Sequence, residues 1–388
     1  MKKIKVLRII DTLDKNYGGP SNTIIDSSKI LSQKGFMVHI LTHDRESRKN
    51  KIKLKNVKIF NKGPSITNYL LNIKIITWLK KNHSKYDFFI IHGIWRFHTL
   101  LARLFLKGRY FVFTHGMLDP YFGTEFWKKL KKKLFWYLIE KKNMQESNTL
   151  LLTSENEKKS LSSTFVNTSG IKKTVISYGI KKNLFNKKNC LISFYNKYPK
   201  LKKKNFFLFL GRFHKKKGCE ILLESVKTLI KQNIHIKILM VGPNNEYKTK
   251  LSDLARRYKI EKNIIWANPL SGKLKWGAIY ASQAMVLSSH GENFGVSIVE
   301  SLSCGKPVLI TNKVNIFKII SNYQAGLVSN DNTKSFYKIL KKYLNLTNDQ
   351  IKKYHKNSYK CFNENFNLTN STNSLENLLE KYSKKINK

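Results

Sequence analysis

Two glutamates eight positions apart lie in the part of the sequence best suited to chemistry. Glu292 belongs to the glycine-bearing segment Gly-Glu-Asn-Phe-Gly, and Glu300 to the run after it, where apolar residues recur near helical spacing. The apolar run 285–287 before them predicts a short buried strand. A strand, a glycine-bearing loop and a helix start favour binding of a phosphorylated ligand, because free backbone N–H groups and the helix dipole point outward there.

A second loop combines glycine with several cations. The segment 211–218 (GRFHKKKG) follows the apolar run 206–210 and precedes a helix predicted over 219–232. Arg212 offers a planar fork of donors and Lys217 a compact ammonium, and together they suit a diphosphate. A solvated basic loop in a lysine-rich chain is the alternative.

Glycine and histidine follow other predicted strands. Gly18 and Gly19 come after the first strand and permit close approach of a ligand, although an ordinary turn explains them equally well. His115 follows the strand predicted over 110–114, and His92 repeats the arrangement one strand earlier; packed histidines are the alternative. The absence of GxGxxG and GxxxxGK[ST] motifs argues against a dinucleotide oxidoreductase and a P-loop NTPase, and no i, i+4 histidine pair suggests a metal.

The composition is strongly basic. Among 388 residues, 73 Lys and Arg face 24 Asp and Glu, giving a formal charge of +49. This charge suits an anionic membrane or charged glycan, or reflects compositional drift; no zinc-ligand set or RNA-recognition signature supports nucleic acid. Four cysteines without a CxxC pair indicate free thiols. With neither a signal peptide nor a bilayer-spanning run, we expect a cytoplasmic protein, and a peripheral position on the inner face of the cytoplasmic membrane stays open.

One predicted helix, 125–142, carries an unusual pattern. Phe126, Leu130, Leu134 and Leu138 form one stripe, and lysines cover much of the remaining surface. Two interpretations stay open: a helix packed on the core with a basic exterior, or an interfacial helix against anionic lipid.

Short apolar runs alternate with helix-length segments, first over 1–180 and again over 205–370. The lysine- and asparagine-rich stretch 181–204 predicts a linker, and the last helix, 371–388, is expected to pack on the N-terminal domain. The fold class is therefore α/β, with two Rossmann-like parallel-sheet domains facing across a cleft. Ligands are expected outside the carboxyl ends of the strands.

In this order, the segments resemble glycosyltransferase family 4, the retaining sugar-nucleotide transferases of GT-B fold. The E-x7-E signature matches Glu292 and Glu300, and Gly-Lys-Pro-Val follows at 305–308. The basic loop and the Gly18-Gly19 loop fit as well, and the resemblance covers roughly residues 1–330. It implies C-terminal helices that cross back to the N-terminal domain.

The resemblance implies roles for charged residues. Glu300 resembles the carboxylate that binds the nucleotide ribose, and Glu292 the one that holds donor-sugar hydroxyls. Arg212 and Lys217 resemble the cations on the diphosphate, and His115 the residue near the transferred sugar and the acceptor. Other donor contacts implied are Gly18, Gly19, Asn293, Phe294, Gly295 and Val296. Neither a metal nor a cofactor is expected, since the two cations can neutralise the diphosphate.

The expected function is transfer of a hexose from a nucleoside-diphosphate sugar, with UDP or GDP, to a glycan or lipid-linked acceptor. Cell-surface polysaccharide or lipopolysaccharide biosynthesis is the expected setting. Two alternatives stay open: a sugar-nucleotide 2-epimerase of the same fold, and a non-enzymatic binder of polyanions or nucleic acid.

Overall fold

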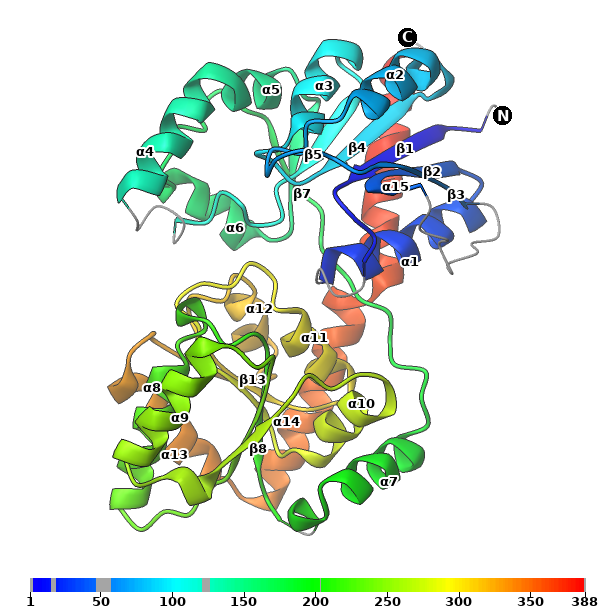
Figure 1. The fold of residues 1–388 in the computed structure, drawn as a ribbon. Helices are drawn as coiled ribbons and strands as arrows, with labels where there is room; N and C mark the ends of the chain where they lie inside the picture. Colours follow the sequence, from blue (N-terminus) through cyan, green and yellow to red (C-terminus); the bar gives the residue numbers. More distant parts are fainter. Residues whose placement is uncertain (1–2, 15–18, 47–56, 121–125, 203, 387–388) are drawn as a thin grey trace. The chain divides into compact units, whose positions relative to one another are not determined.

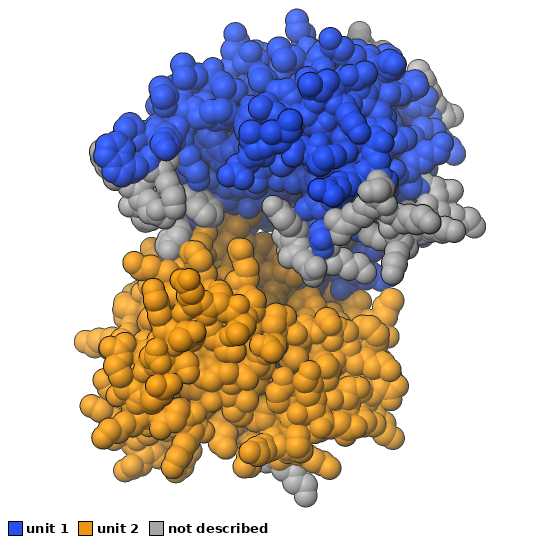
Figure 2. Space-filling view, in the orientation of Figure 1, with its two compact units in different colours: residues 1–181, 368–388 blue, residues 182–367 orange. Residues whose placement is uncertain are grey.

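The computed structural model describes residues 3–14, 19–46, 57–120, 126–202 and 204–386. The chain divides into two compact units (Figure 2). Unit 1 comprises residues 1–181 and 368–388, and unit 2 comprises residues 182–367. Each unit is built on one parallel sheet with helices packed around it (Figure 1).

The described part of unit 1 contains a seven-stranded parallel sheet in the order β3-β2-β1-β4-β5-β6-β7. Its strands are β1 (Lys5–Ile10), β2 (Met37–Arg45), β3 (Val57–Gly63), β4 (Phe88–His92), β5 (Tyr110–Phe113), β6 (Thr149–Leu152) and β7 (Lys173–Val175). Val6 of β1 pairs with Val38 and with Phe88. Because side chains alternate along a strand, Val6 and its neighbour Leu7 enter separate hydrophobic cores on the two faces of the sheet.

The helices of unit 1 include one from the far end of the chain. They are α1 (Gly19–Gln33), α2 (Ile73–Asn82), α3 (Phe97–Phe105), α4 (Phe126–Phe135), α5 (Lys141–Gln145), α6 (Glu155–Ser160) and α15 (Leu368–Ile386). Leu375 and Leu379 of α15 lie in the same buried cluster as Val6, Phe88 and Phe111. Figure 1 shows α15 beside the strands of unit 1. One face of the N-terminal sheet is therefore covered in part by residues that follow unit 2 in the sequence.

Unit 2 contains, among its described residues, a six-stranded parallel sheet in the order β10-β9-β8-β11-β12-β13. The strands are β8 (Phe207–Leu210), β9 (Ile238–Val241), β10 (Ile264–Ala267), β11 (Met285–Leu287), β12 (Val308–Thr311) and β13 (Gly326–Ser329). The helices are α7 (Lys187–Lys197), α8 (Cys219–Lys231), α9 (Glu246–Arg257), α10 (Gly272–Ala281), α11 (Val296–Ser303), α12 (Phe317–Asn322), α13 (Thr333–Leu344) and α14 (Asn348–Cys361).

The strand order of unit 2 decides where its site lies. The order reverses between β8 and β11, which are neighbours although they are far apart in the sequence. The two loops singled out in the sequence follow these two strands, so both leave the same edge of the sheet at its topological switch point, where open α/β sheets bind ligands.

The linker predicted over 181–204 is wrong for most of its length. Helix α7 lies there and packs on α10 within unit 2. Cys190 and Phe194 are fully buried, and a Cβ on Gly277 of α10 would lie 2.3 Å from the Cys190 carbonyl oxygen. Two buried positions one helical turn apart were too weak a pattern to stand out among lysines and asparagines.

The single helix predicted over 125–142 is interrupted. Helix α4 ends at Phe135, the π-helical turn η4 (Trp136–Glu140) follows, and α5 continues. Leu130, Leu134 and Leu138 are 50%, 62% and 68% exposed. The core-packed interpretation of this leucine stripe is therefore wrong: the inward-facing side chains include the fully buried Trp136.

Candidate active site

The position of Glu292 is fixed by backbone hydrogen bonds in the loop between β11 and α11. Its N–H donates to the Lys313 carbonyl oxygen at 3.0 Å, and its own carbonyl oxygen accepts from the Asn315 N–H at 2.9 Å. The Asn315 side-chain amide also donates to Oδ1 of Asn293 at 3.2 Å. The loop is thus held against the segment after β12, which gives the Glu292 carboxylate a defined location.

The Lys217 ammonium forms an ion pair with the Glu292 carboxylate. Lys217 ends the short 3-10 turn η7 (Lys215–Lys217), which follows β8. The next residue, Gly218, has φ +58°, and a Cβ there would lie 2.1 Å from the Ser288 carbonyl oxygen. The Ser288 hydroxyl in turn donates to the Gly218 carbonyl oxygen at 2.6 Å. These contacts join the two predicted ligand-binding loops, as the adjacency of β8 and β11 requires.

The loop after β8 concentrates positive charge. Burial and the neighbouring charges of Lys216 and Arg212 lower the pKa of Lys217 to about 8. Arg212 itself is exposed. Like charges held this close repel one another, so a bound polyanion such as a diphosphate would relieve the repulsion and form charge-assisted hydrogen bonds.

Helix α11 begins at the other side of the same loop. Gly295 caps the helix with φ +74°, and a Cβ there would lie 2.6 Å from Cδ1 of Ile298. Phe294 is buried and packs edge-on against Phe366, with ring centroids 5.7 Å apart. The N–H groups of Val296 and Ser297, the first two of the helix, have no partner within the helix and can face an anion, whereas the Ile298 N–H already donates to the Gly295 carbonyl oxygen at 2.9 Å.

Glu300 lies on α11 and forms an ion pair with Lys275 of α10, at 2.6 Å between Nζ and Oε1. The two side chains are 14% and 24% exposed, so the pair is partly shielded from water. Sequence reasoning missed Lys275. The available cue was a lysine between Leu274 and Trp276 in an otherwise apolar helical segment.

In unit 1, His115 is the last member of a buried polar chain. Nε of Arg8 lies 3.2 Å from Nε2 of His92, and Nδ1 of His92 lies 3.0 Å from Nε2 of His115. A guanidinium only donates, so His92 Nε2 accepts; the neutral His92 then carries its proton on Nδ1 and donates to His115. His115 therefore accepts through Nε2 and carries its own proton on Nδ1.

The charge of these imidazoles is set by their surroundings. Burial lowers the pKa of His115 to about 4, and the positive charge of Arg8 acts in the same direction. Burial and Arg8 also lower the pKa of His92. Both rings are neutral near pH 7, and His115 offers an N–H donor to a neighbouring oxygen while leaving no free basic nitrogen.

A buried carboxylate that sequence reasoning missed holds the His115 loop. Glu157 Oε1 accepts from the Thr114 hydroxyl at 2.9 Å and from the Gly116 N–H at 3.2 Å. Its Oε2 accepts from the Thr153 N–H at 2.6 Å. Glu157 thus contacts both residues that flank His115, whose φ of +47° is uncommon for a residue with a side chain.

The glycines after the first strand are only partly described. Gly18 lies outside the described residues, and Gly19 is the first residue of α1. The Ser21 hydroxyl donates to the Thr12 carbonyl oxygen at 3.0 Å, which ties the start of α1 to the segment after β1.

Two features that the described residues lack bear on the class of site. They contain no group of three or more His, Cys, Asp or Glu side chains arranged to hold a metal ion. None of the helices in the described ranges combines the length and the apolar character that a bilayer crossing needs.

Comparison with known families identifies the unit that carries the charged loops. Residues 193–360 match the family described as glycosyl transferases group 1. We call this matched segment, which lies within unit 2, the group 1 domain. It contains Arg212, Lys217, Glu292 and Glu300, so the predicted charged residues of unit 2 all fall within it.

Two relatives extend the similarity of the group 1 domain. An alpha-1,3/1,6-mannosyltransferase, ALG2 of Dictyostelium discoideum, is 24% identical over 200 residues, which cover 47% of this chain and 47% of the relative. The chain thus spans about half the length of that relative. An uncharacterized glycosyltransferase of Methanocaldococcus jannaschii is 25% identical over 404 residues, covering 98% of this chain and 99% of the relative.

Solved structures show the fold of the whole chain. Sucrose-phosphate synthase from Thermosynechococcus elongatus superimposes with a TM-score of 0.78 at 16% identity, covering 98% of this chain and 99% of its own. HepE of Anabaena, crystallised with UDP and glucose, gives 0.74 at 14% identity, with 97% and 100% covered. WaaG, a glycosyltransferase involved in lipopolysaccharide biosynthesis, gives 0.71 at 14%, with 96% and 99% covered. The two α/β units are those of the GT-B fold, which confirms the predicted fold class.

Proposed function

We propose that this protein is a retaining glycosyltransferase that moves a hexose from a nucleoside-diphosphate sugar to a glycan or lipid-linked acceptor. The observation that carries the proposal is the arrangement at the switch point of the group 1 domain. There the loop cations, the Lys217–Glu292 pair and the start of α11 lie together. The UDP and glucose bound by HepE support a nucleotide-sugar donor, and WaaG supports a role in cell-surface polysaccharide or lipopolysaccharide assembly.

Stabilisation of the leaving group is the main chemical task. Cleavage of the bond between the anomeric carbon and the diphosphate oxygen gives an oxocarbenium-like sugar and a diphosphate with growing negative charge. Arg212, Lys217 and the amides that begin α11 stabilise that charge where it develops. A single preorganised donor of this kind contributes roughly 3–4 kcal/mol in known enzymes.

The two glutamates position the donor. Glu300 accepts hydrogen bonds from the ribose hydroxyls, and its ion pair with Lys275 orients the carboxylate. Glu292 accepts from hydroxyls of the transferred sugar, and Lys217 orients its carboxylate in the same way. Neither role needs a glutamate to act as a nucleophile.

The acceptor's proton passes to the leaving phosphate and not to a histidine. The acceptor oxygen bonds to the anomeric carbon on the face that the diphosphate leaves, and its proton passes to the leaving phosphate oxygen, which retains the anomeric configuration. His115 cannot take this proton readily, because its Nε2 already accepts from His92. We assign His115 to hydrogen-bond donation toward the transferred sugar or the acceptor.

Acceptor-dependent release of nucleoside diphosphate tests the proposal. A thermal-shift screen with UDP-, GDP- and ADP-sugars first identifies the donor, since a bound ligand raises the unfolding temperature. Arg212→Ala and Glu300→Ala should each lower turnover by about 100-fold or more. Arg256→Ala, a change at an exposed arginine of α9, is the matched control and should keep the wild-type rate.

The same assay separates the alternatives. A sugar-nucleotide 2-epimerase would convert the donor to its C2 epimer without an acceptor and without net release of diphosphate, so epimerised donor formed in the absence of an acceptor points to that reaction. A binder of polyanions would respond steeply to salt and would tolerate replacement of Glu292. Wild-type turnover in both the Arg212 and Glu300 variants would remove the site assignment.

Helix α4 supports a peripheral membrane location. Trp127 is 72% exposed, alongside the exposed leucine stripe at 130, 134 and 138, and Lys131 and Lys133 are exposed on the same helix. Apolar side chains beside lysines are typical of interfacial binding to anionic lipid. Flotation should recover the protein with anionic vesicles and leave it behind with neutral ones; Leu134→Ser/Leu138→Ser should abolish recovery. Equal flotation with both lipids would contradict the electrostatic part.

A further inference from the structure

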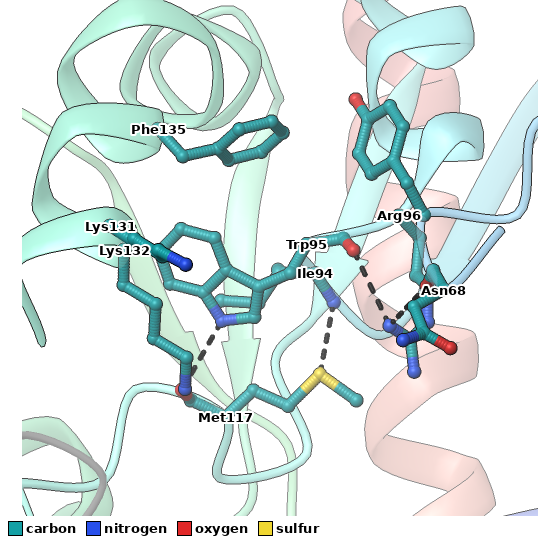
Figure 3. Close-up of a pocket in the computed structure, with 9 residues that line it drawn as sticks. Asn68, Ile94, Trp95, Arg96, Met117, Lys131, Lys132 and Phe135 are labelled. Carbon is teal, nitrogen blue, oxygen red and sulfur yellow. Dashed lines mark hydrogen bonds between the residues drawn. The ribbon is translucent and has the colours of Figure 1, made fainter. Parts of the chain in front are cut away.

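Unit 1 contains a cavity of about 500 Å³ that none of the donor-binding residues lines. It lies between the loops after β3, β4 and β5 and one side of α4. Figure 3 shows Phe135 and two lysines of α4 on one side of the Trp95 ring, and Arg96 with Asn68 on the other. Four segments far apart in the sequence therefore form one hollow within a single unit.

The walls of this cavity are apolar and well fixed. The Phe135 ring packs against Tyr69 and Trp95, with centroids 5.2 and 6.1 Å apart. The Trp95 indole N–H donates to the Met117 carbonyl oxygen at 3.4 Å (Figure 3). The Trp95 backbone N–H donates to the buried Glu140 at 2.7 Å. An aromatic surface that is held in place before a ligand arrives loses little freedom on binding.

Positive charge surrounds the apolar walls. Arg96, Lys131 and Lys132 line the cavity, and its described lining contains no carboxylate. Arg96 is oriented by an ion pair with Asp11 at 2.8 Å, and Lys132 lies 5.8 Å from the Trp95 ring centroid. Lys131 is exposed at the end of the cavity formed by α4. The ligand must therefore combine an apolar body with negative charge.

We infer that this cavity binds an amphipathic anion: an isoprenoid or acyl chain that ends in a phosphate or diphosphate. The chain packs on Trp95 and Phe135, and the phosphate contacts Lys131, Lys132 and Nη2 of Arg96. The other guanidinium nitrogens of Arg96 already donate, Nε to Asp11 and Nη1 to the carbonyl oxygens of Asn68 and Trp95. The inference rests on the proposed function and deepens it, because it names a lipid-linked phosphate as the class of acceptor.

A bare sugar fits the lining less well. Each buried hydroxyl needs hydrogen-bond partners, and a site that recognises several hydroxyls must supply both donors and acceptors. The described lining offers one side-chain amide, Asn68, and one phenol, Tyr69, whose hydroxyl is buried and has no hydrogen-bond partner among the described residues. The charged side chains of the lining, Arg96, Lys131 and Lys132, are cations, which cannot accept.

Helix α4 links the cavity to the expected lipid surface. Phe135 lines the cavity, whereas its neighbour Leu134 is largely exposed and does not. Lys131 and Lys132 line the cavity, and Lys129 and Lys133 do not. One helix thus supplies both the ligand contacts and their controls. Lys129 and Lys133 are the controls for Lys131 and Lys132, and Leu134 is the control for Phe135.

Direct binding of geranyl phosphate to the full-length protein tests the inference. Isothermal titration calorimetry in the absence of donor should give saturable binding of geranyl phosphate, at least about tenfold tighter than binding of geraniol or inorganic phosphate. Only geranyl phosphate can contact both the apolar walls and the lining cations. Lys131→Ala/Lys132→Ala should weaken geranyl phosphate by about five- to tenfold and leave geraniol unchanged. Phe135→Ala should weaken both geranyl phosphate and geraniol.

The matched variants decide the outcome. Lys129→Ala/Lys133→Ala and Leu134→Ala should keep wild-type affinity. Equal losses in the two lysine pairs would reduce the effect to general surface charge and overturn the inference. So would binding of inorganic phosphate as tight as that of geranyl phosphate, or a short oligosaccharide that binds where geranyl phosphate does not.

Failure here is distinguishable from failure of the proposed function. Arg212→Ala and Glu300→Ala should leave geranyl phosphate binding unchanged, because both residues belong to unit 2. If transfer depends on these two residues but geranyl phosphate does not bind, the cavity assignment alone is wrong. If geranyl phosphate binds as expected but transfer does not depend on them, the donor site is wrong and the cavity assignment stands.

Discussion

The Lys275 ammonium of α10 contacts the Glu300 carboxylate of α11 at 2.6 Å. The carboxylate that we propose to bind ribose is therefore positioned by a cation from the neighbouring helix of the same unit. Lys275 is accordingly a positioning residue, whose effect on the donor passes through Glu300.

Loss of Lys275 should weaken donor binding more than chemistry. In Lys275→Met the glutamate loses its partner and its orientation, so we expect KM for the donor to rise about five- to tenfold with kcat changed less than twofold. Lys273→Met changes an exposed lysine of the same helix and should behave as the wild type. In Glu300→Ala the Lys275 substitution should have no further effect, and additive losses would show that the two residues act separately.

The chain from Arg8 through His92 to His115 predicts an order of activities. His92→Asn keeps a hydrogen-bond donor toward His115, whereas His92→Leu keeps none. We therefore expect kcat to be highest in the wild type, lower in His92→Asn and lowest in His92→Leu, with a loss of about tenfold or more in His92→Leu. Nitrogen-15 NMR should find the His115 proton on Nδ1 in the wild type and distributed over both nitrogens in Leu. An unchanged tautomer in His92→Leu would contradict the assignment.

Glu140 predicts a stability change with pH. Burial raises its pKa from 4.5 to about 7. Between these values the unfolded chain loses a proton that the folded protein keeps, so the free energy of unfolding falls as pH rises from about 4.5 to about 7, by at most about 3 kcal/mol. Thermal unfolding of Glu140→Gln should lack this decline relative to the wild type.

Glu146→Gln is the control for Glu140, because it changes an exposed glutamate after α5. The buried histidines, whose pKa values are lowered, give a change of opposite sign below pH 6.5, and they are the same in all three proteins. The difference between variants therefore isolates Glu140, and parallel pH profiles for wild type and Glu140→Gln would exclude this titration.

Gly295 and Gly272 form a matched pair of glycines at helix starts. Both have positive φ, +74° and +52°, but a Cβ would collide with Ile298 at Gly295 and meet nothing within 4 Å at Gly272. Both alanine variants should lose about 1 kcal/mol of stability through backbone strain. Gly295→Ala should lose more and should also weaken donor binding, which a thermal-shift titration with the donor measures. Equal behaviour would argue that the loop before α11 can relax.

Local patterns made the charged loops predictable. A strand, a glycine-bearing loop and a helix start are contiguous in the sequence around Glu292 and Glu300. The basic loop around Lys217 is equally local, so the sequence alone predicted both loops as ligand-binding. The Lys217–Glu292 ion pair was not predicted, because it requires β8 and β11 to be neighbours and the strand order was not predicted.

Contacts that depend on packing between helices or on strand order were out of reach. Lys275 meets Glu300 only because α10 packs beside α11, and His92 meets Arg8 only because β4 pairs with β1. The π-helical turn that brings Glu140 to the Trp95 backbone has no sequence signature comparable to a glycine or a proline. Helix α7 was missed because its buried face consists of few residues.

The position of α15 on the first sheet sets an order of maturation. Unit 2 is one continuous stretch and can bury its core as soon as residue 367 has emerged during synthesis, whereas one sheet face of unit 1 lacks part of its cover until residues 368–386 exist. The unit made first is thus finished last, and a nascent chain halted before α15 should expose Val6, Phe88 and Phe111 to chaperones.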